Sequence, residues 1–355
     1  YLLHGILRRG EADVYCLVRA ADADEGRRRI AANVAKYLDW DPAWARRVVP
    51  VVGDLGDAAL GLSDAQFRAL AERTDAIVHN GGVVNFTLPY GRMRGPNVEG
   101  TAWVLRLACA GRAKPVHFVS TLGVHATREN QNQLVHEGDA MPDITRVHDA
   151  YTQTKWVADA LVQAVGARGV PVTVHRPARV GPDYRTGASN ADDYFARMIR
   201  AVAEMGAMPD LGWNWDVAPV DQVAAAIVEA VLDPAWLGGT YHYFNPRILP
   251  FAEIAGAVRD EGYPVRALPY LEWRACAREA ATDASHPLYP LLPLFPAELK
   301  GTLAPRFDTP ATERLMAAAG VAWPDPDRAF VRRTIQYFIR RGVLKGAPAT
   351  ASEPA

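Results

Sequence analysis

Two side chains four residues apart, Tyr151 and Lys155, could together perform acid–base chemistry on a carbonyl group. Residues four apart are neighbours on one face of a helix, and an ammonium close to a phenol favours the phenolate and so lowers the pKa of the phenol. A tyrosine of this kind can give a proton to a developing alkoxide near neutral pH. The chain has only five lysines but thirteen tyrosines, so chance could produce the spacing, which gains weight from the elements around it.

A second hydroxyl donor lies upstream, where Ser120 and Thr121 close a short apolar strand. Thr121 at the carboxyl edge of that strand could donate to the same substrate oxygen as Tyr151, while Lys155 could also hydrogen-bond a cofactor ribose. Without this strand–helix setting, an exposed pair on a helix and a threonine that caps a turn would explain the same residues.

Charged residues near the first two strands could hold a nucleotide. Arg19 ends the first strand, where an acidic residue would bind a ribose diol, and an arginine there suits the 2′-phosphate of NADP. Arg29 in the following helix could be a second phosphate ligand, or part of a solvated basic face. Asp54 could accept from an adenine amino group while Leu55 packs on the ring, although Asp54 could also serve only a turn.

Small and polar residues also follow the third strand. Asn80, Gly81 and Gly82 stand where glycine would let the backbone approach a cofactor closely, or where they would form only a tight turn. Asn97 begins a helix, where it could be an N-cap or could point inward against the catalytic helix. The cofactor site expected from these residues is therefore spread over several strand ends.

The elements that must position these residues are short apolar strands alternating with helices. Such a pattern indicates a parallel, doubly wound sheet covered on both faces. The strands are expected at 13–19, 48–52, 76–79, 115–120, 171–175 and 240–244. The helices are expected at 1–10, 22–38, 63–73, 97–111, 150–165, 192–205, 221–232 and 327–341.

These elements predict an α/β fold with a Rossmann-like doubly wound parallel sheet over residues 1–180, to which 215–245 return. A smaller, mostly helical C-terminal substrate lobe is expected from 181–214 and 246–345, followed by a disordered tail at 346–355 that is rich in Ala, Pro and Ser. The chain begins inside its first helix. The strand and glycine-rich loop that would present this helix to a pyrophosphate are therefore expected upstream of Tyr1.

The composition of the chain bears on its binding partners and on its cellular location. A formal net charge of −1 gives no electrostatic footprint for nucleic acid or an anionic membrane. Neither an apolar run of membrane-spanning length nor a leader-like start is seen, and three scattered cysteines without metal spacing fit a reducing cytoplasm. We therefore expect a cytoplasmic protein without a metal site, and no Gly-x-Ser-x-Gly elbow supports a serine hydrolase.

Several segments together carry a family resemblance. They are Cys16–Arg19, Gly53–Leu55, His79–Asn85 with Pro89–Tyr90, Asn97–Thr101, Phe118–Thr121, Tyr151–Trp156, Arg176–Pro177, Thr186–Asn190 and Pro219–Asp221. With them the chain resembles the extended short-chain dehydrogenase/reductases. More narrowly, it is similar to the thioester reductase domains that terminate nonribosomal peptide and polyketide assembly lines, which are kin to carboxylic acid and aminoadipate reductases.

The resemblance implies a reductase that uses NADPH to release a thioester-bound acyl or peptidyl chain as an aldehyde, and for some substrates as the alcohol. The partner would be a carrier protein bearing phosphopantetheine, within a multidomain synthetase. The implied catalytic triad is Thr121, Tyr151 and Lys155. The implied cofactor contacts come from Arg19 and Arg29 to the 2′-phosphate and from Asp54 and Leu55 to the adenine.

Two other functions remain open from the sequence. An extended reductase or epimerase acting on a free small molecule, such as a nucleotide sugar, would use the same Tyr-x-x-x-Lys pair. A non-catalytic nucleotide sensor on this fold would not need Thr121, Tyr151 and Lys155 together, so their joint presence argues against it.

Overall fold

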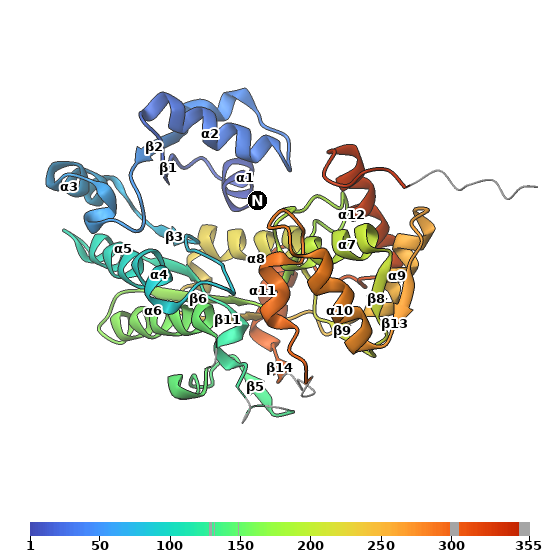
Figure 1. Cartoon of the computed structure of the whole chain (residues 1–355). Coiled ribbons are helices and arrows are strands. Elements are labelled where there is room, and N and C mark those ends of the chain that lie inside the picture. Colours follow the sequence, from blue (N-terminus) through green and yellow to red (C-terminus); the bar gives the residue numbers. More distant parts are fainter. Residues whose placement is uncertain (128–129, 131, 148, 299–304, 348–355) are drawn as a thin grey trace, which may run out of the picture. The chain divides into compact units, whose positions relative to one another are not determined.

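The computed structural model describes residues 1–127, 130, 132–147, 149–298 and 305–347, and the chain forms two compact units (Figure 1). Unit 1 consists of Tyr1–Ala178, Val223–Tyr243 and Leu303–Ala322. Unit 2 consists of Arg179–Gln222, Phe244–Thr302 and Trp323–Ala355. The predicted tail at 346–355 lies, from residue 348 on, outside the described residues.

Parallel strands form the centre of unit 1. Four of them pair in the order β11 (Thr240–Tyr243), β6 (Val172–Pro177), β4 (Val116–Val119) and β3 (Ile77–His79). Two more, β1 (Val14–Val18) and β2 (Val48–Val52), pair with each other in parallel. Helices separate these strands along the chain, so the predicted α/β class with parallel strands is confirmed.

The parallel strands form two pieces rather than one continuous sheet. Among the described residues, β1 pairs only with β2, and β3 pairs only with β4. In the strand order of a doubly wound sheet, the first strand of the fold lies between the strands that correspond to β1 and β3 here. The location of that strand upstream of Tyr1 stays a prediction.

Helices α5 (Gly100–Cys109) and α6 (Ala150–Gly166) cover one face of the four-stranded piece, where Phe118 and Val174 pack against Ala158 and Val162. Helix α6 begins after Asp149 because the carboxylate of Asp149 accepts a hydrogen bond from the Thr152 amide at 2.8 Å. This cap fixes the first turn of the helix on which Tyr151 and Lys155 lie.

The remaining helices of unit 1 pack around this centre. Helix α2 (Ala23–Ala35) lies close against β1 and β2, since a Cβ on Gly26 would come within 3.0 Å of Pro50 and Val18. Helix α1 (Leu2–Arg9) packs on α8 (Val220–Leu232) through Gly5 and Val228. The other helices of this unit are α3 (Asp64–Arg73), α4 (Tyr90–Arg94), the π-helical turn η3 (Gly95–Glu99) and the 3₁₀ turns η1 (Pro42–Arg46), η2 (Ala58–Gly61), η4 (Leu122–His125), η5 (Ile144–Arg146) and η6 (Pro234–Trp236).

Residues 303–322 group with unit 1, whereas the sequence placed them in the C-terminal lobe. Strand β14 (Arg306–Asp308) pairs in parallel with β5 (Leu134–His136). Helix α11 (Pro310–Ala318) begins where the buried carboxylate of Glu137 accepts from the amides of Ala311 at 2.7 Å and Thr312 at 2.9 Å. These contacts hold the segment to unit 1. The segment that returns from unit 2 begins at Val223 rather than at 215.

Unit 2 is mostly helical, and its hydrophobic core is rich in aromatic side chains. Its helices are α7 (Tyr194–Met205), α9 (Phe251–Asp260), α10 (Tyr270–Ala280), α12 (Arg328–Arg340) and the 3₁₀ turn η7 (Tyr289–Leu294). Its short strands pair as β7 (Val180–Gly181) with β10 (Ala218–Pro219), β8 (Ala207–Pro209) with β13 (Arg266–Leu268), and β9 (Asn214–Trp215) with β12 (Leu249–Pro250). Its core includes Phe195, Trp215, Phe251, Trp273, Phe295 and Phe330.

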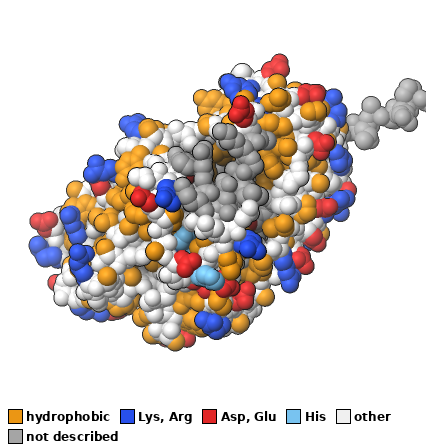
Figure 2. Space-filling model, turned by 90° about the horizontal axis from the view of Figure 1, so that it is seen from below, with side chains coloured by type: hydrophobic (Ala, Val, Ile, Leu, Met, Phe, Trp, Pro, Cys, Tyr) orange, Lys and Arg blue, Asp and Glu red, His pale blue; other side chains and the backbone are white. Residues whose placement is uncertain are grey.

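The surface agrees with the nearly balanced composition. On the face that Figure 2 shows, basic and acidic side chains are interspersed among apolar ones rather than gathered by sign. Within the part of the chain that the structure describes, no helix is both long enough and apolar enough to cross a membrane.

Candidate functional site

The three predicted catalytic residues come from two adjoining elements of unit 1. Thr121 follows β4 and begins η4, while Tyr151 and Lys155 lie on the first turns of α6. Gly123 lies between the first turn of α6 and Thr121, since a Cβ on Gly123 would lie 3.3 Å from Thr152 Oγ1 and 3.4 Å from Thr121 Oγ1. The structure therefore brings the predicted hydroxyl donors and the lysine to one end of the sheet.

The Lys155 ammonium is buried against the end of β4. Its Nζ donates a hydrogen bond to the Val119 carbonyl at 2.7 Å and lies 4.3 Å from the centre of the Phe118 ring. Burial lowers the pKa of Lys155 to about 8, and the nearby Asp159 carboxylate opposes that shift. Lys155 thus sits in a site where its charge is held by neighbouring groups rather than by water.

The pKa of Tyr151 is shifted in the opposite direction to the one predicted. The sequence predicted a phenol pKa lowered by the neighbouring ammonium, but burial raises the pKa of Tyr151 to about 12, and the Asp149 carboxylate adds to the rise. Lys155 is instead engaged by the Val119 carbonyl. Tyr151 is therefore a neutral hydroxyl donor at physiological pH, and its ring contacts Phe86 edge-on with centroids 5.5 Å apart.

The Thr121 side chain caps the η4 turn that follows it. Its side chain accepts a hydrogen bond from the Gly123 amide at 3.1 Å, so the oxygen is fixed at the start of η4. A hydroxyl that accepts through a lone pair still has its own O–H to donate. Thr121 can therefore cap the turn and act as a donor at once.

Asn97 joins the loop after β3 to helix α6. Its side-chain oxygen accepts from the Val83 amide at 2.6 Å, and its Nδ2 donates to the Val83 carbonyl and to Thr154 Oγ1, both at 2.9 Å. Asn97 lies inside the π-helical turn η3, so the N-cap interpretation is wrong and the inward one is confirmed. Such turns inside helices frequently occur at functional sites.

The loop from Asn80 to Leu88 carries exposed apolar side chains, one of which, Phe86, contacts Tyr151. The Asn85 side chain accepts from the amides of Thr87 at 2.8 Å and Leu88 at 2.9 Å, which fixes the loop locally. Val84 is 65% exposed, and Phe86 and Leu88 are also exposed. Asn80, Gly81 and Gly82 at the start of the loop are exposed as well.

The predicted phosphate ligands lie together at the carboxyl end of β1. Arg29 donates from its guanidinium to the Arg19 carbonyl, which brings the two arginines side by side. The Arg19 side chain is 76% exposed and lies 3.9 Å from a carboxylate oxygen of Asp54. The other Asp54 oxygen accepts from the Gly56 amide at 2.8 Å, so Asp54 does serve a turn.

Leu55 and Gly81, which are predicted to contact different parts of the cofactor, lie close together. A Cβ on Gly81 would lie 2.8 Å from the Leu55 side chain, and one on Gly100 would lie 2.4 Å from the Leu55 carbonyl. A Cβ on Gly82 would lie 3.1 Å from Asn97 Oδ1. These glycines allow the loops after β2 and β3 to pack closely against each other and against the helical segment of Asn97 and Gly100.

A buried polar cluster beside the triad was not foreseen from the sequence. Asp159, which has no exposed side-chain surface, pairs with Arg176, which is 2% exposed, at 2.9 Å. Ser120 donates to the same carboxylate at 2.6 Å. The available signal was the spacing, since Asp159 follows Lys155 by four residues on one helix face.

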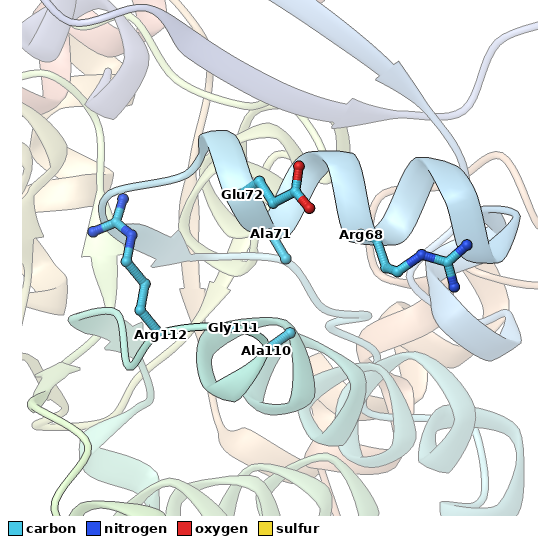
Figure 3. Close-up of a pocket in the computed structure, with 6 residues that line it drawn as sticks. All are labelled: Arg68, Ala71, Glu72, Ala110, Gly111 and Arg112. Atoms are coloured by element: carbon cyan, nitrogen blue, oxygen red, sulfur yellow. The ribbon is translucent and has the colours of Figure 1, made fainter.

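The cavity in Figure 3 lies elsewhere in unit 1. It has a volume of about 380 Å³ and is lined by Arg68, Ala71, Glu72, Ala110, Gly111 and Arg112. The two arginines stand at opposite ends and point away from the space between the helices (Figure 3). None of the predicted site residues lines it. Within the described part of the chain, no group of three or more His, Cys, Asp or Glu is placed to hold a metal ion.

A protein family resembles this chain over residues 1–227, and individual relatives resemble it over nearly its whole length. The NAD_binding_4 family, described as "Male sterility protein", matches residues 1–227. A linear gramicidin synthase polypeptide of Brevibacillus parabrevis is 34% identical over 349 residues, which are 97% of this chain and 7% of that protein. "L-2-aminoadipate reductase" of Schizosaccharomyces pombe is 29% identical over 342 residues, 92% of this chain and 24% of that protein.

A solved structure matches as well. The terminal R domain from the myxalamid PKS-NRPS biosynthetic pathway is 37% identical, with a TM-score of 0.91 over 98% of this chain and 89% of that chain. The chain thus spans most of that domain but only 7% and 24% of the lengths of the two curated relatives.

Proposed function

The chain belongs to the NAD_binding_4 family, and from that premise we propose that it is a reductase domain that uses NADPH to release a carrier-bound acyl or peptidyl thioester. Its 37% identity to a terminal R domain confirms the resemblance seen in the sequence. The observation on which the proposal rests most is the convergence of Thr121, Tyr151 and Lys155 at the end of β4 and the start of α6.

The proposed chemistry uses the two hydroxyl groups as donors to the thioester oxygen. NADPH would supply a hydride to the thioester carbon. Tyr151, whose phenol stays protonated because burial raises its pKa further, to about 12, and Thr121 would donate hydrogen bonds to the oxygen as negative charge develops on it. Protonation of that oxygen gives a hemithioacetal. Cleavage of the carbon–sulfur bond, with a proton passing to sulfur, then leaves an aldehyde and the carrier thiol.

Arg19 and Arg29 support the choice of NADPH over NADH. A guanidinium binds a phosphate through two parallel hydrogen bonds, and Arg19 is exposed at the end of β1, where the second ribose of a dinucleotide lies in this fold class. Asp54 and Leu55 would bound the adenine, while Gly81 and Gly82 let the backbone come close. The residues present therefore fit a 2′-phosphorylated dinucleotide.

We further propose that a strand and glycine-rich loop complete this site between β1 and β3. Both strands have a free edge toward that position among the described residues. The pyrophosphate would then lie at the amino end of α1, as it does at helix amino ends in other nucleotide sites.

The acyl group would lie along Val84, Phe86 and Leu88. Exposed apolar side chains on a fixed loop favour an apolar ligand, and Phe86 touches the proposed proton donor Tyr151. The thiol side of the substrate would be the phosphopantetheine arm of a carrier protein in the same synthetase. Relatives that are much longer than this chain support such a multidomain parent.

The test is NADPH consumption with an acyl-pantetheine thioester, followed at 340 nm, an absorption that the reduced nicotinamide has and the oxidised one lacks. We expect turnover with the thioester and none with a nucleotide sugar. The ratio of NADPH consumed to thiol released distinguishes an aldehyde product from an alcohol. Turnover of a nucleotide sugar, without turnover of any thioester, would reject the proposal in favour of the epimerase or reductase alternative.

A further inference from the structure

Asp159 is the centre of a buried network that surrounds the proposed triad without belonging to it. Its carboxylate accepts from Ser120 Oγ at 2.6 Å, from Gln163 Nε2 at 2.6 Å, and from Arg176 Nε at 2.9 Å and Nη2 at 3.1 Å. Two oxygens thus receive four donors, which a carboxylate can accommodate. A buried charge of this kind is stable only while its partners remain in place.

Arg176 extends the network to two further elements. Its Nη1 lies 3.0 Å from His125 Nε2 in η4 and 3.3 Å from His242 Nε2 in β11. Burial and the positive charge of Arg176 both lower the pKa of His125, to about 4, so this imidazole is neutral and can accept from the guanidinium. One guanidinium therefore joins β6, β11, α6 and the turn that begins at Thr121.

The network touches each side of the triad. Ser120 directly precedes Thr121 at the end of β4, and Asp159 follows Lys155 by one helical turn on α6. A shift of Ser120 or Asp159 would therefore move Thr121 relative to Tyr151 and Lys155. Small displacements of this kind at a reaction centre cost as much as about 100-fold in rate.

We propose that Asp159 and Arg176 are positioning residues, which hold Thr121 against the first turns of α6 and keep a carboxylate beside the Lys155 ammonium. This inference deepens the proposed function and rests on it for the identity of the reaction. The pairing itself belongs to the folded chain and can be tested without any substrate.

Asp159 also affects the protonation of Lys155. Asp159 on the same helix and His79 at the end of β3 interact electrostatically with Lys155, and Arg176 of β6 acts through Asp159. Tyr151 lies one helical turn before Lys155 on α6. Burial and the Lys155 charge both lower the pKa of His79, to about 3, so that ring is neutral. Asp159 is the one carboxylate that raises the pKa of Lys155.

The ionisation of Asp159 agrees with this role. Burial alone would raise its pKa, but hydrogen bonds from Arg176, the Arg176 charge and the Ser120 hydroxyl outweigh burial and lower it. Asp159 is thus a carboxylate at every pH at which Lys155 titrates.

The substitution Asp159→Asn keeps the shape and removes the charge. Carbon-13 labelling of the five lysines would let NMR follow the titration of Lys155 directly in the protein alone. We expect Lys155 to lose its proton at lower pH than in the wild type, and the fall of kcat at alkaline pH to move in the same direction. We also expect kcat at its optimum to fall by up to about 100-fold, with less change in the KM for NADPH.

Two variants serve as controls. Asp159→Glu restores the charge and should return the Lys155 titration toward that of the wild type. Asp64→Asn makes the same chemical change at an exposed position on α3 and should alter neither the titration nor kcat. A folded Asp159→Asn protein with an unchanged Lys155 titration and an unchanged kcat would overturn the inference.

Ser120→Ala provides a second test if the Asp159→Asn variant does not fold. It removes one hydrogen bond to Asp159 and leaves every charge in place, so we expect a severalfold loss of kcat with little change in the Lys155 titration. A wild-type kcat for Ser120→Ala would overturn the positioning role. If the wild type reduced no thioester at all, the proposed function would fail, and the NMR titration would still decide whether Asp159 acts on Lys155.

Discussion

The two halves of the candidate site in unit 1 are built in opposite ways. Around Lys155, charged groups are buried and fully engaged, as the Asp159–Arg176 pair at 2.9 Å shows. Around Arg19, charged groups are exposed and loosely paired, since the Arg19 side chain is 76% exposed and lies 3.9 Å from Asp54. The first half is fixed by the fold, and the second has free hydrogen-bond donors.

This difference follows from what each half is proposed to do. Donors that stabilise a developing charge act best when they are already oriented, because no reorganisation is then needed during the reaction. A phosphate ligand can instead be a flexible, solvated arginine, because the phosphate supplies the charge that organises it. Substitutions in the two halves should therefore have different consequences.

The largest effect is expected from Tyr151→Phe, which removes only the phenolic hydroxyl. Loss of a general acid typically costs about 10²–10⁴-fold in rate. We therefore expect kcat to fall by that amount while the KM for NADPH changes little, as measured by steady-state kinetics. A Tyr151→Phe enzyme with normal kcat would mean that another group is the proton donor.

The next largest effect is on stability and compares the two charged pairs. Arg176→Ala leaves the buried Asp159 carboxylate without its partner, which costs about 3–5 kcal/mol. Arg19→Ala breaks only an exposed contact, which contributes about 0–1 kcal/mol. Urea unfolding of the two variants should show this difference in free energy of unfolding. Equal losses would contradict the division of the site into a fixed and a loose half.

A smaller effect is expected on cofactor choice. Arg19→Ala removes a charged donor to the 2′-phosphate, and such hydrogen bonds contribute about 1.5–3 kcal/mol, or about 10–100-fold in affinity. The KM for NADPH should rise by that factor while the KM for NADH stays unchanged. Arg27→Ala on the same helix as Arg29 is the matched control, because Arg27 pairs with Asp24 at 2.7 Å. Equal effects of both substitutions on NADPH would remove the specific role of Arg19.

The smallest effect concerns pH. Burial lowers the pKa of Lys155 to about 8, so its ammonium predominates below that pH and is lost as the pH rises through it. If activity needs the ammonium, kcat/KM should fall by about tenfold per unit above this range. Lys155→Arg keeps its charge at all these pH values. The fall of kcat/KM at alkaline pH should therefore be absent from the Lys155→Arg variant, whatever its overall rate.

The sequence predicted the elements of unit 1 well because their signals are local. Strand β2 occupies residues 48–52 as predicted, since a nearly continuous run of valines is typical of a buried strand. Helix α6 begins at Ala150 because Asp149 caps it. The positions of Thr121, Tyr151 and Lys155 relative to one another follow from these elements and the parallel sheet.

What the sequence did not predict depends on residues that are distant along the chain. Strand β14 pairs with β5, and Glu137 accepts from the amide of Thr312, yet no periodicity links these segments. The partners of Asp159 lie on β4 and β6, and only the folded sheet brings them together. The raised pKa of Tyr151 was also missed, because burial opposes the expected effect of Lys155 and burial is a property of the fold.

Isotope transfer tests most directly whether this site passes a hydride to a thioester carbon. An acyl-pantetheine thioester would be incubated with NADPH deuterated at the transferable position, and the product analysed by mass spectrometry. We predict an aldehyde or its alcohol that carries deuterium on the former carbonyl carbon, formed by the wild type and far more slowly by Tyr151→Phe. Recovery of only intact thioester or unlabelled carboxylic acid would contradict the account.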